Sequence, residues 1–216
     1  MTTDGGVSRG LRSLLLSADA AFILLHLFHA YTPYFAHKDF SLEQDNGFAE
    51  VFQYVKWYWI GTMLLRLSFR TRQAAFGFWA LAFGYLLLDD ALQIHERGGA
   101  EIARRFGYAS LFHLRAQDFG ELTVTALAAA AFFALIGGAC LRSAAAVREV
   151  SKRLLILLGA VAVCGVGFDL LHVMLRDLRG GSLLALLEDG GEMVLVSLTC
   201  WYVSVVLEHE GRDPFP

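Results

Sequence analysis

The sequence has few charged residues and few cysteines. Asp, Glu, Lys and Arg make up 18% of its 216 residues, against about 25% in a typical soluble domain. The net charge of −3 gives no sign of the basic surface expected of a nucleic-acid-binding protein. Cys140, Cys164 and Cys200 lie in apolar runs without a CxxC spacing, which argues against a disulfide framework and favours buried thiols. The sequence also lacks a phosphate loop, a dinucleotide fingerprint and a nucleophile-elbow serine.

Hydrophobic residues are abundant and are gathered into long runs. They form 56% of the chain, and the mean hydropathy is +0.50. This pattern predicts an all-α fold, a polytopic transmembrane helix bundle, in a single domain over residues 1–216. The first run could begin as a signal peptide, but it outlasts such a segment and is interpreted as a retained helix. The six predicted spans are 11–33, 50–68, 73–94, 117–140, 154–175 and 183–207.

The distribution of Lys and Arg predicts the orientation of the bundle. With a cytoplasmic N-terminus, the inner segments carry ten of these residues and the outer loops seven. The bias favours N-in and C-in topology in a bacterial inner membrane, with membrane lipids as the surrounding partners. No feature predicts the oligomeric state.

The segment between the third and fourth spans has an amphipathic pattern. Apolar residues lie opposite a pair of arginines, which predicts a short helix in the membrane interface. The aromatic residues at the outer end of the second span are expected in an interfacial belt. The apolar residues are Ile102, Phe106, Leu111 and Leu114, the arginines are Arg104 and Arg105, and the belt residues are Trp57, Tyr58 and Trp59.

Ionisable residues lie at matching ends of five predicted spans. Since consecutive spans run in opposite directions, the end of an odd-numbered span and the start of an even-numbered one share a leaflet. Ionisable groups at membrane depth are functional candidates by default. The alternative is that these are helix-end charges solvated among the headgroups. The residues are His26 and His29; Asp89, Asp90, His95 and Glu96; Asp118 and Glu121; Asp169 and His172; Glu188, Asp189 and Glu192.

Residue spacing predicts which of these side chains share a helix face. Positions three, four or seven apart lie together, so Asp89, Gln93 and Glu96 form one set. Asp90 and His95 fall on another face of that helix, and their membership of the site is left open. Lys56, within the second span, could neutralise one carboxylate.

The mixture of carboxylates and histidines favours a divalent metal such as zinc, iron or manganese. The Asp169-x-x-His172 step is similar to the acidic-x-x-His step of di-metal carboxylate bundles. Glu96 and Asp118 are the candidate catalytic residues, as a general base that does not bind the metal. The predicted metal ligands are Asp89, Glu121, Asp169, His172, Glu188, Glu192, His26 and His29.

These residues predict a metal-dependent membrane enzyme, either a hydrolase or an oxidase, that acts on a lipid-soluble substrate. Buried carboxylates also mark proton- or cation-coupled transporters and channels. That alternative requires polar residues toward the opposite leaflet, and the inner halves of the last three spans contain few. A third possibility is a non-catalytic membrane subunit.

Two short stretches, LLLDDALQIHE and LLEDGGEM, carry a resemblance to a protein family. The sequence resembles uncharacterised bacterial polytopic membrane proteins that pair an acidic-x(4)-His-Glu helix with a later Glu-acidic-x-x-Glu helix. The resemblance implies a multi-helix membrane fold and no particular activity.

Overall fold

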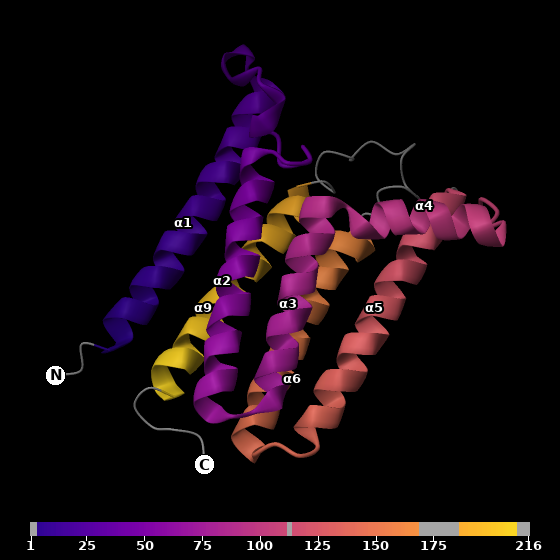
Figure 1. Ribbon diagram of the computed structural model, residues 1–216. Helices are drawn as coiled ribbons and strands as arrows, with labels where there is room; N and C mark the ends of the chain where they lie inside the picture. Colours follow the sequence, from indigo (N-terminus) through magenta and orange to yellow (C-terminus); the bar gives the residue numbers. More distant parts are fainter. Residues whose placement is uncertain (1–3, 112–113, 169–185, 211–216) are drawn as a thin grey trace.

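The computed structural model describes residues 4–111, 114–168 and 186–210, which form a bundle of helices (Figure 1). The predicted all-α fold is confirmed. The helical elements in chain order are α1 (Asp4–Tyr31), η1 (Pro33–Phe35), η2 (Lys38–Phe40), α2 (Phe48–Thr71), α3 (Ala74–Leu92), α4 (Ile94–Phe106), α5 (Ala116–Cys140), α6 (Ala145–Ala162), η3 (Val163–Phe168), η4 (Leu186–Gly190) and α9 (Gly191–Glu210).

Within these ranges, five helical segments are long and apolar enough to cross a membrane: Ser8–Tyr31, Ala74–Leu92, Ala116–Cys140, Ala145–Phe168 and Leu186–Glu210. The α2 helix, expected as a sixth span, has a comparable length but is more polar. Its Gln53 and Lys56 are buried inside the bundle. The five segments make this a membrane protein, and the orientation of the bundle stays a prediction.

The α9 helix lies at the centre of the bundle, in contact with α1, α2 and α6. The α2 and α3 helices pack along each other, and α3 also contacts α5. Half of the α9 span is buried in the protein, whereas only 6% of the α5 span is. The outward apolar face of α5 is therefore left for lipid, as expected of a membrane helix at the edge of a bundle. The short α4 helix crosses the end of the bundle where α3 stops and α5 starts (Figure 1).

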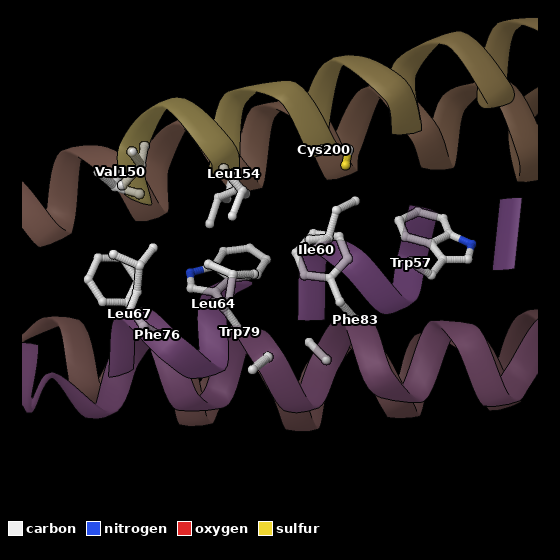
Figure 2. Close-up of a cluster of buried hydrophobic side chains, with 14 of the residues drawn as sticks. Trp57, Ile60, Leu64, Leu67, Phe76, Trp79, Phe83, Val150, Leu154 and Cys200 are labelled. Carbon is white, nitrogen blue, oxygen red and sulfur yellow. The ribbon is translucent and has the colours of Figure 1, made fainter. Parts of the chain in front are cut away.

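A core of buried hydrophobic side chains fills the bundle between α2, α3, α6 and α9. Figure 2 shows aromatic side chains of α2 and α3 facing aliphatic ones of α6, with Cys200 of α9 beside them. Such close packing fixes the helices relative to one another, because voids forfeit dispersion contacts. The residues labelled in Figure 2 are Trp57, Ile60, Leu64, Leu67, Phe76, Trp79, Phe83, Val150, Leu154 and Cys200.

Two predicted helix boundaries were wrong in ways that affect the site. The third predicted span was expected to carry one helical face through Glu96, but the helix breaks at Gln93, which has a left-handed backbone with φ 51°. The fifth predicted span starts at Ala145 rather than residue 154. Its first turns are amphipathic: Val147 and Ser151 are buried while Lys152 is exposed, so hydropathy alone does not reveal them. The predicted end of that span, at residue 175, lies outside the described residues.

Candidate functional site

The break at Gln93 folds the chain back so that His95 contacts Asp89. The His95 backbone N–H donates to Asp89 Oδ1 at 2.9 Å, and His95 Nδ1 lies 3.0 Å from Asp89 Oδ2. Tyr85 donates its hydroxyl to the same carboxylate at 3.3 Å. A carboxylate at Nδ1 fixes the tautomer and the orientation of the imidazole, which leaves Nε2 available as a base or a ligand. The expectation that Asp89, Gln93 and Glu96 share a face is therefore wrong.

A glycine contact between α4 and α5 places Glu121 beside this dyad. A Cβ added at Gly120 would lie 2.0 Å from the Gly99 carbonyl oxygen, and one at Gly99 would lie 2.5 Å from the Glu121 backbone nitrogen. Only glycines permit such an approach of two backbones. The Glu121 carboxylate accepts a hydrogen bond from Gln117 Nε2 at 2.8 Å.

Asp118, predicted as a general base, has a structural role at the start of α5. Its Oδ2 accepts from the Arg115 backbone N–H at 2.7 Å, and Arg115 Nη2 donates to Oδ1 at 2.6 Å. This is a capping interaction that satisfies a free donor at the helix start. Asp118 is buried and borders a cavity described below, but its oxygens already bind Arg115.

The start of α9 presents Glu192 to the same end of the bundle. Gln53 of α2 donates its Nε2 to Glu192 Oε1 at 2.7 Å. Gly165 of η3 leaves room for the other oxygen, since a Cβ there would lie 2.6 Å from Glu192 Oε2. Both η3 and η4 have wide π-helical turns, a feature frequent at functional sites.

Three adjoining cavities open at this end of the bundle, and we name them by position. The loop cavity, of about 160 Å³, borders residues 42–45, 49–50 and 53, together with Asp90, Asp189, Glu192 and Met193. The middle cavity, of about 260 Å³, lies between α3, α5, α6 and α9. The rim cavity, of about 510 Å³, lies outside it, bordered by His95, Glu96, Glu121 and Glu188. Asp90 and Glu192 border both the loop and the middle cavities.

The middle cavity has a lining of mixed chemistry. Its polar residues are Asp89, Asp90, His95, Asp118, Glu121 and Glu192. Its apolar residues include Leu86, Leu122, Leu158, Val161, Ala162 and Val166. A molecule bound there would meet carboxylates, one imidazole and aliphatic carbon.

Asp90 accepts a hydrogen bond from Trp57, which the sequence predicted to lie in the interfacial belt. Trp57 donates its indole N–H to Asp90 Oδ2 at 2.8 Å and is only 2% exposed, so the belt prediction was wrong for this residue. Its neighbours Tyr58 and Trp59 are exposed. The sequence left open whether Asp90 and His95 join the site, and both border the middle cavity.

Glu96 and His95, which border the rim cavity, have shifted pKa values. Burial raises the pKa of the Glu96 carboxyl, although His95 nearby acts in the opposite direction. The hydrogen bond to Asp89 raises the pKa of His95 above its ordinary 6.5, and this effect is larger than the opposing effect of burial. Glu96 is the other candidate catalytic residue, and it borders the rim cavity. Its raised pKa means that the carboxyl holds its proton more tightly than usual.

Two predicted ligands, His26 and His29, lie away from these cavities. His26 Nδ1 accepts the Leu42 backbone N–H at 3.1 Å, and His29 Nδ1 lies 2.6 Å from the Phe35 carbonyl oxygen. Both histidines hold the loop after α1 and do not border the three cavities. Asp169 and His172 lie outside the described residues. Glu188 borders the rim cavity, as predicted for the start of the last span.

A second group of buried charges, largely missed by the sequence reasoning, lies deeper in the bundle. Lys56 Nζ donates to Asp19 Oδ1 at 3.1 Å, to the Met193 carbonyl oxygen at 2.8 Å and to Ser197 Oγ at 3.2 Å. Lys56 and Asp19 are fully buried. The sequence indicated that Lys56 could neutralise a carboxylate, but it did not identify Asp19 as that carboxylate. The signal was available, since Gln53 and Lys56 are three residues apart on one face of an apolar helix.

In residues 4–111, 114–168 and 186–210, no three His, Cys, Asp or Glu side chains converge closely enough to hold a metal ion as they stand. The cavities nevertheless bring many of the predicted ligands within one small region.

The chain also matches a known protein family. A family profile matches residues 40–206, and the family is described as Domain of unknown function (DUF8692).

The chain belongs to this family. The matched segment contains every residue that borders the three cavities, from Leu42 to Met193. His26, His29 and Asp19, on α1, precede it. No curated protein and no solved structure matches the chain. The family assignment therefore marks the cavity-bearing part of the bundle and carries no activity.

Proposed function

We propose that this protein is a membrane enzyme that uses a divalent metal ion in the middle cavity to act on a lipid-soluble substrate. The observation that carries the proposal is the mixed lining of that cavity. It combines carboxylates and His95 with aliphatic side chains from α3, α5 and α6. An amphipathic substrate would place its reactive polar group against the former and its hydrocarbon against the latter.

The donor chemistry of the polar side suits zinc, iron or manganese. His95, oriented by Asp89, would supply an imidazole nitrogen, and Asp90, Glu121 and Glu192 would supply oxygens. Since no three of the described donors already converge, binding would require rotation of the carboxylates toward His95. Crowded carboxylates favour such closure, because a cation relieves their mutual repulsion.

The chain's own groups would then manage the proton and the substrate. A metal in this position would supply a water that ionises near neutral pH. Glu96 on the rim would accept and return a proton, and its raised pKa suits that exchange. The aliphatic side would exclude bulk water from the reacting group. Hydrolysis and oxidation are both compatible with this arrangement.

The alternative of a proton- or cation-coupled transporter requires a polar route to the opposite end of the bundle. Beneath the cavities the described core is mainly aromatic and aliphatic (Figure 2), with the uncharged Ser151, Ser197 and Ser204 also buried. The nearest buried charges, Lys56 and Asp19, bind each other. These features favour an enzyme over a transporter.

Elemental analysis of the detergent-purified protein tests the proposal. We expect a transition metal in stoichiometric amount in the wild type and a loss of at least about tenfold in affinity in Glu192→Gln and His95→Gln. Glu149→Gln is the matched control, because Glu149 is an exposed residue of α6 that pairs with Arg153. Incubation with membrane lipid extracts, followed by mass spectrometry, would then identify the substrate.

Two results would contradict the proposal. One is the absence of metal from protein grown in metal-supplemented medium, together with no thermal stabilisation by added zinc, manganese or ferrous iron. The other is proton flux through reconstituted protein without metal, which would favour the transporter. A protein that binds no metal and conducts no protons would favour the third possibility, a non-catalytic membrane subunit.

A further inference from the structure

The α4 helix and the loop after it form a surface with its own chemistry, separate from the three cavities. Because α4 joins the end of α3 to the start of α5, it lies at the level where two spans leave the membrane (Figure 1). Gly99 and Ala103 are buried, and Gly99 packs directly on α5. The opposite face carries Arg97, Glu101 and Arg104, all exposed, with Arg105 beside them.

The arginines of this face are not explained by pairing within the protein. Arg104 pairs with Glu101. Arg97 and Arg105 make no ion pair within the described part of the chain. Arg97 lies in the first turn of α4, where the helix dipole disfavours a positive charge. The face therefore carries a net positive charge at headgroup level without an internal partner.

A groove opens directly beyond the C-terminal end of α4. It is lined by Tyr108, Ala109, Leu111, Phe119 and Thr123 and has a volume of about 350 Å³. Tyr108 Oη lies 3.3 Å from Thr123 Oγ1, which holds the loop against α5. Thr123 is three residues beyond Gly120, the α5 residue that contacts α4, or about 4.5 Å along the helix axis. The groove therefore begins at the level of α4 and extends toward the apolar part of α5.

Phe106, the last residue of α4, is 70% exposed, and Leu111, which lines the groove, is 56% exposed. Aromatic and aliphatic residues beside arginines are typical of helices that lie in the membrane interface. Basic residues between membrane helices bind the headgroups of anionic lipids.

We infer that α4 and this groove form a binding site for an anionic phospholipid. Arg97, Arg104 and Arg105 attract the phosphate-bearing headgroup, and the groove beside Phe119 and Thr123 holds part of one acyl chain. The site lies outside the cavities of the proposed enzyme, so the two proposals are tested separately.

Native mass spectrometry of the purified protein tests the inference. The probes are phosphatidylglycerol and phosphatidylcholine with identical acyl chains. The wild type should retain phosphatidylglycerol preferentially, and the R97Q/R104Q/R105Q variant should retain roughly tenfold less. The matched control is R66Q/R70Q/R72Q, which removes three exposed arginines from α2 and its end and should retain wild-type amounts.

Thr123→Phe tests the groove, because the larger side chain fills it while the arginines remain. Retention of phosphatidylglycerol should fall, and glycerol phosphate, a headgroup without acyl chains, should not displace the bound lipid. Equal retention of both lipids, equal losses in the two triple variants, or displacement by glycerol phosphate would overturn the inference. Circular dichroism and size-exclusion profiles confirm that each variant is folded.

Discussion

Two groups of charged residues lie at different depths along α2 and α9, and they differ in charge balance. The deeper pair is fully buried, whereas Glu43 and Asp45 of the upper group are exposed. In the deeper group, Lys56 faces Asp19 and fills its remaining donor positions with Met193 and Ser197. The upper group surrounds the cavities. The loop cavity alone is lined by six acidic residues and no basic one: Glu43, Asp45, Glu50, Asp90, Asp189 and Glu192.

The difference separates a structural group from a candidate functional one. Each of the three donor positions of Lys56 has a partner, and the group ties α1, α2 and α9 together, although Asp19 Oδ2 has no hydrogen-bond partner among the described residues. Carboxylates in excess are not complete, because each ionised group disfavours the ionisation of its neighbours. Protons or an added cation would relieve this repulsion at the cavities, whereas Lys56 and Asp19 already neutralise each other.

The largest effect is expected from breaking the balanced pair. Lys56→Met leaves the Asp19 carboxylate buried without its counter-ion, and removal of one partner of a buried pair costs about 3–5 kcal/mol. The free energy of unfolding, measured in mixed micelles, should fall by this amount. The double variant Lys56→Met with Asp19→Leu should recover most of the loss. If the double variant were as unstable as Lys56→Met alone, the balanced-pair interpretation would be wrong.

The next effect is expected from adding a divalent cation to the protein. A divalent metal at about 100 times its dissociation constant should stabilise the wild type by about 2.7 kcal/mol. Glu192→Gln should abolish this stabilisation and, in metal-free buffer, should be more stable than the wild type because repulsion is relieved. Thermal unfolding with and without chelator measures both effects. The same metal response in Glu192→Gln would count against the cavity as the binding site.

A smaller effect is expected at the glycine contact between α4 and α5, which positions His95 relative to Glu121. Gly120→Ala places a methyl group against the Gly99 carbonyl and forces α4 from α5, which costs about 1–3 kcal/mol. Gly137→Ala, in the same helix, meets no atom within 4 Å and is the control. Metal affinity should fall only in Gly120→Ala, since His95 and Glu121 lie on opposite sides of this contact. Equal behaviour of the two variants would contradict the close approach.

The smallest effect concerns pH. The hydrogen bond to Asp89 raises the pKa of His95 above 6.5 in the folded protein. Its stabilising contribution is therefore complete below pH 6.5 and is lost as the pH rises through the folded-state value. In the presence of chelator, the unfolding temperature of the wild type should decline over this window, and His95→Gln should reduce the decline. An unchanged slope in His95→Gln would assign the pH dependence to another group.

The general architecture could be predicted from apolar runs, because spans of about 20 apolar residues follow from membrane thickness. The same reasoning placed Asp89, Glu121 and Glu192 at one end of the bundle, since alternating spans return to the same side. It failed at Gln93, where a single left-handed residue changes the direction of every later side chain. It also did not identify Asp19 as the partner of Lys56, because the two are 37 residues apart in the sequence.

The sequence by itself determined the membrane class, most of the helix positions and the end of the bundle that carries the ionisable residues. These follow from composition and from the alternation of spans, which are local or nearly local properties of the chain. Only the tertiary structure decided which charges meet. It paired His95 with Asp89, Trp57 with Asp90, Gln53 with Glu192 and Lys56 with Asp19. Such pairings depend on helix rotation and on close glycine contacts, which are set by packing between segments distant in the sequence.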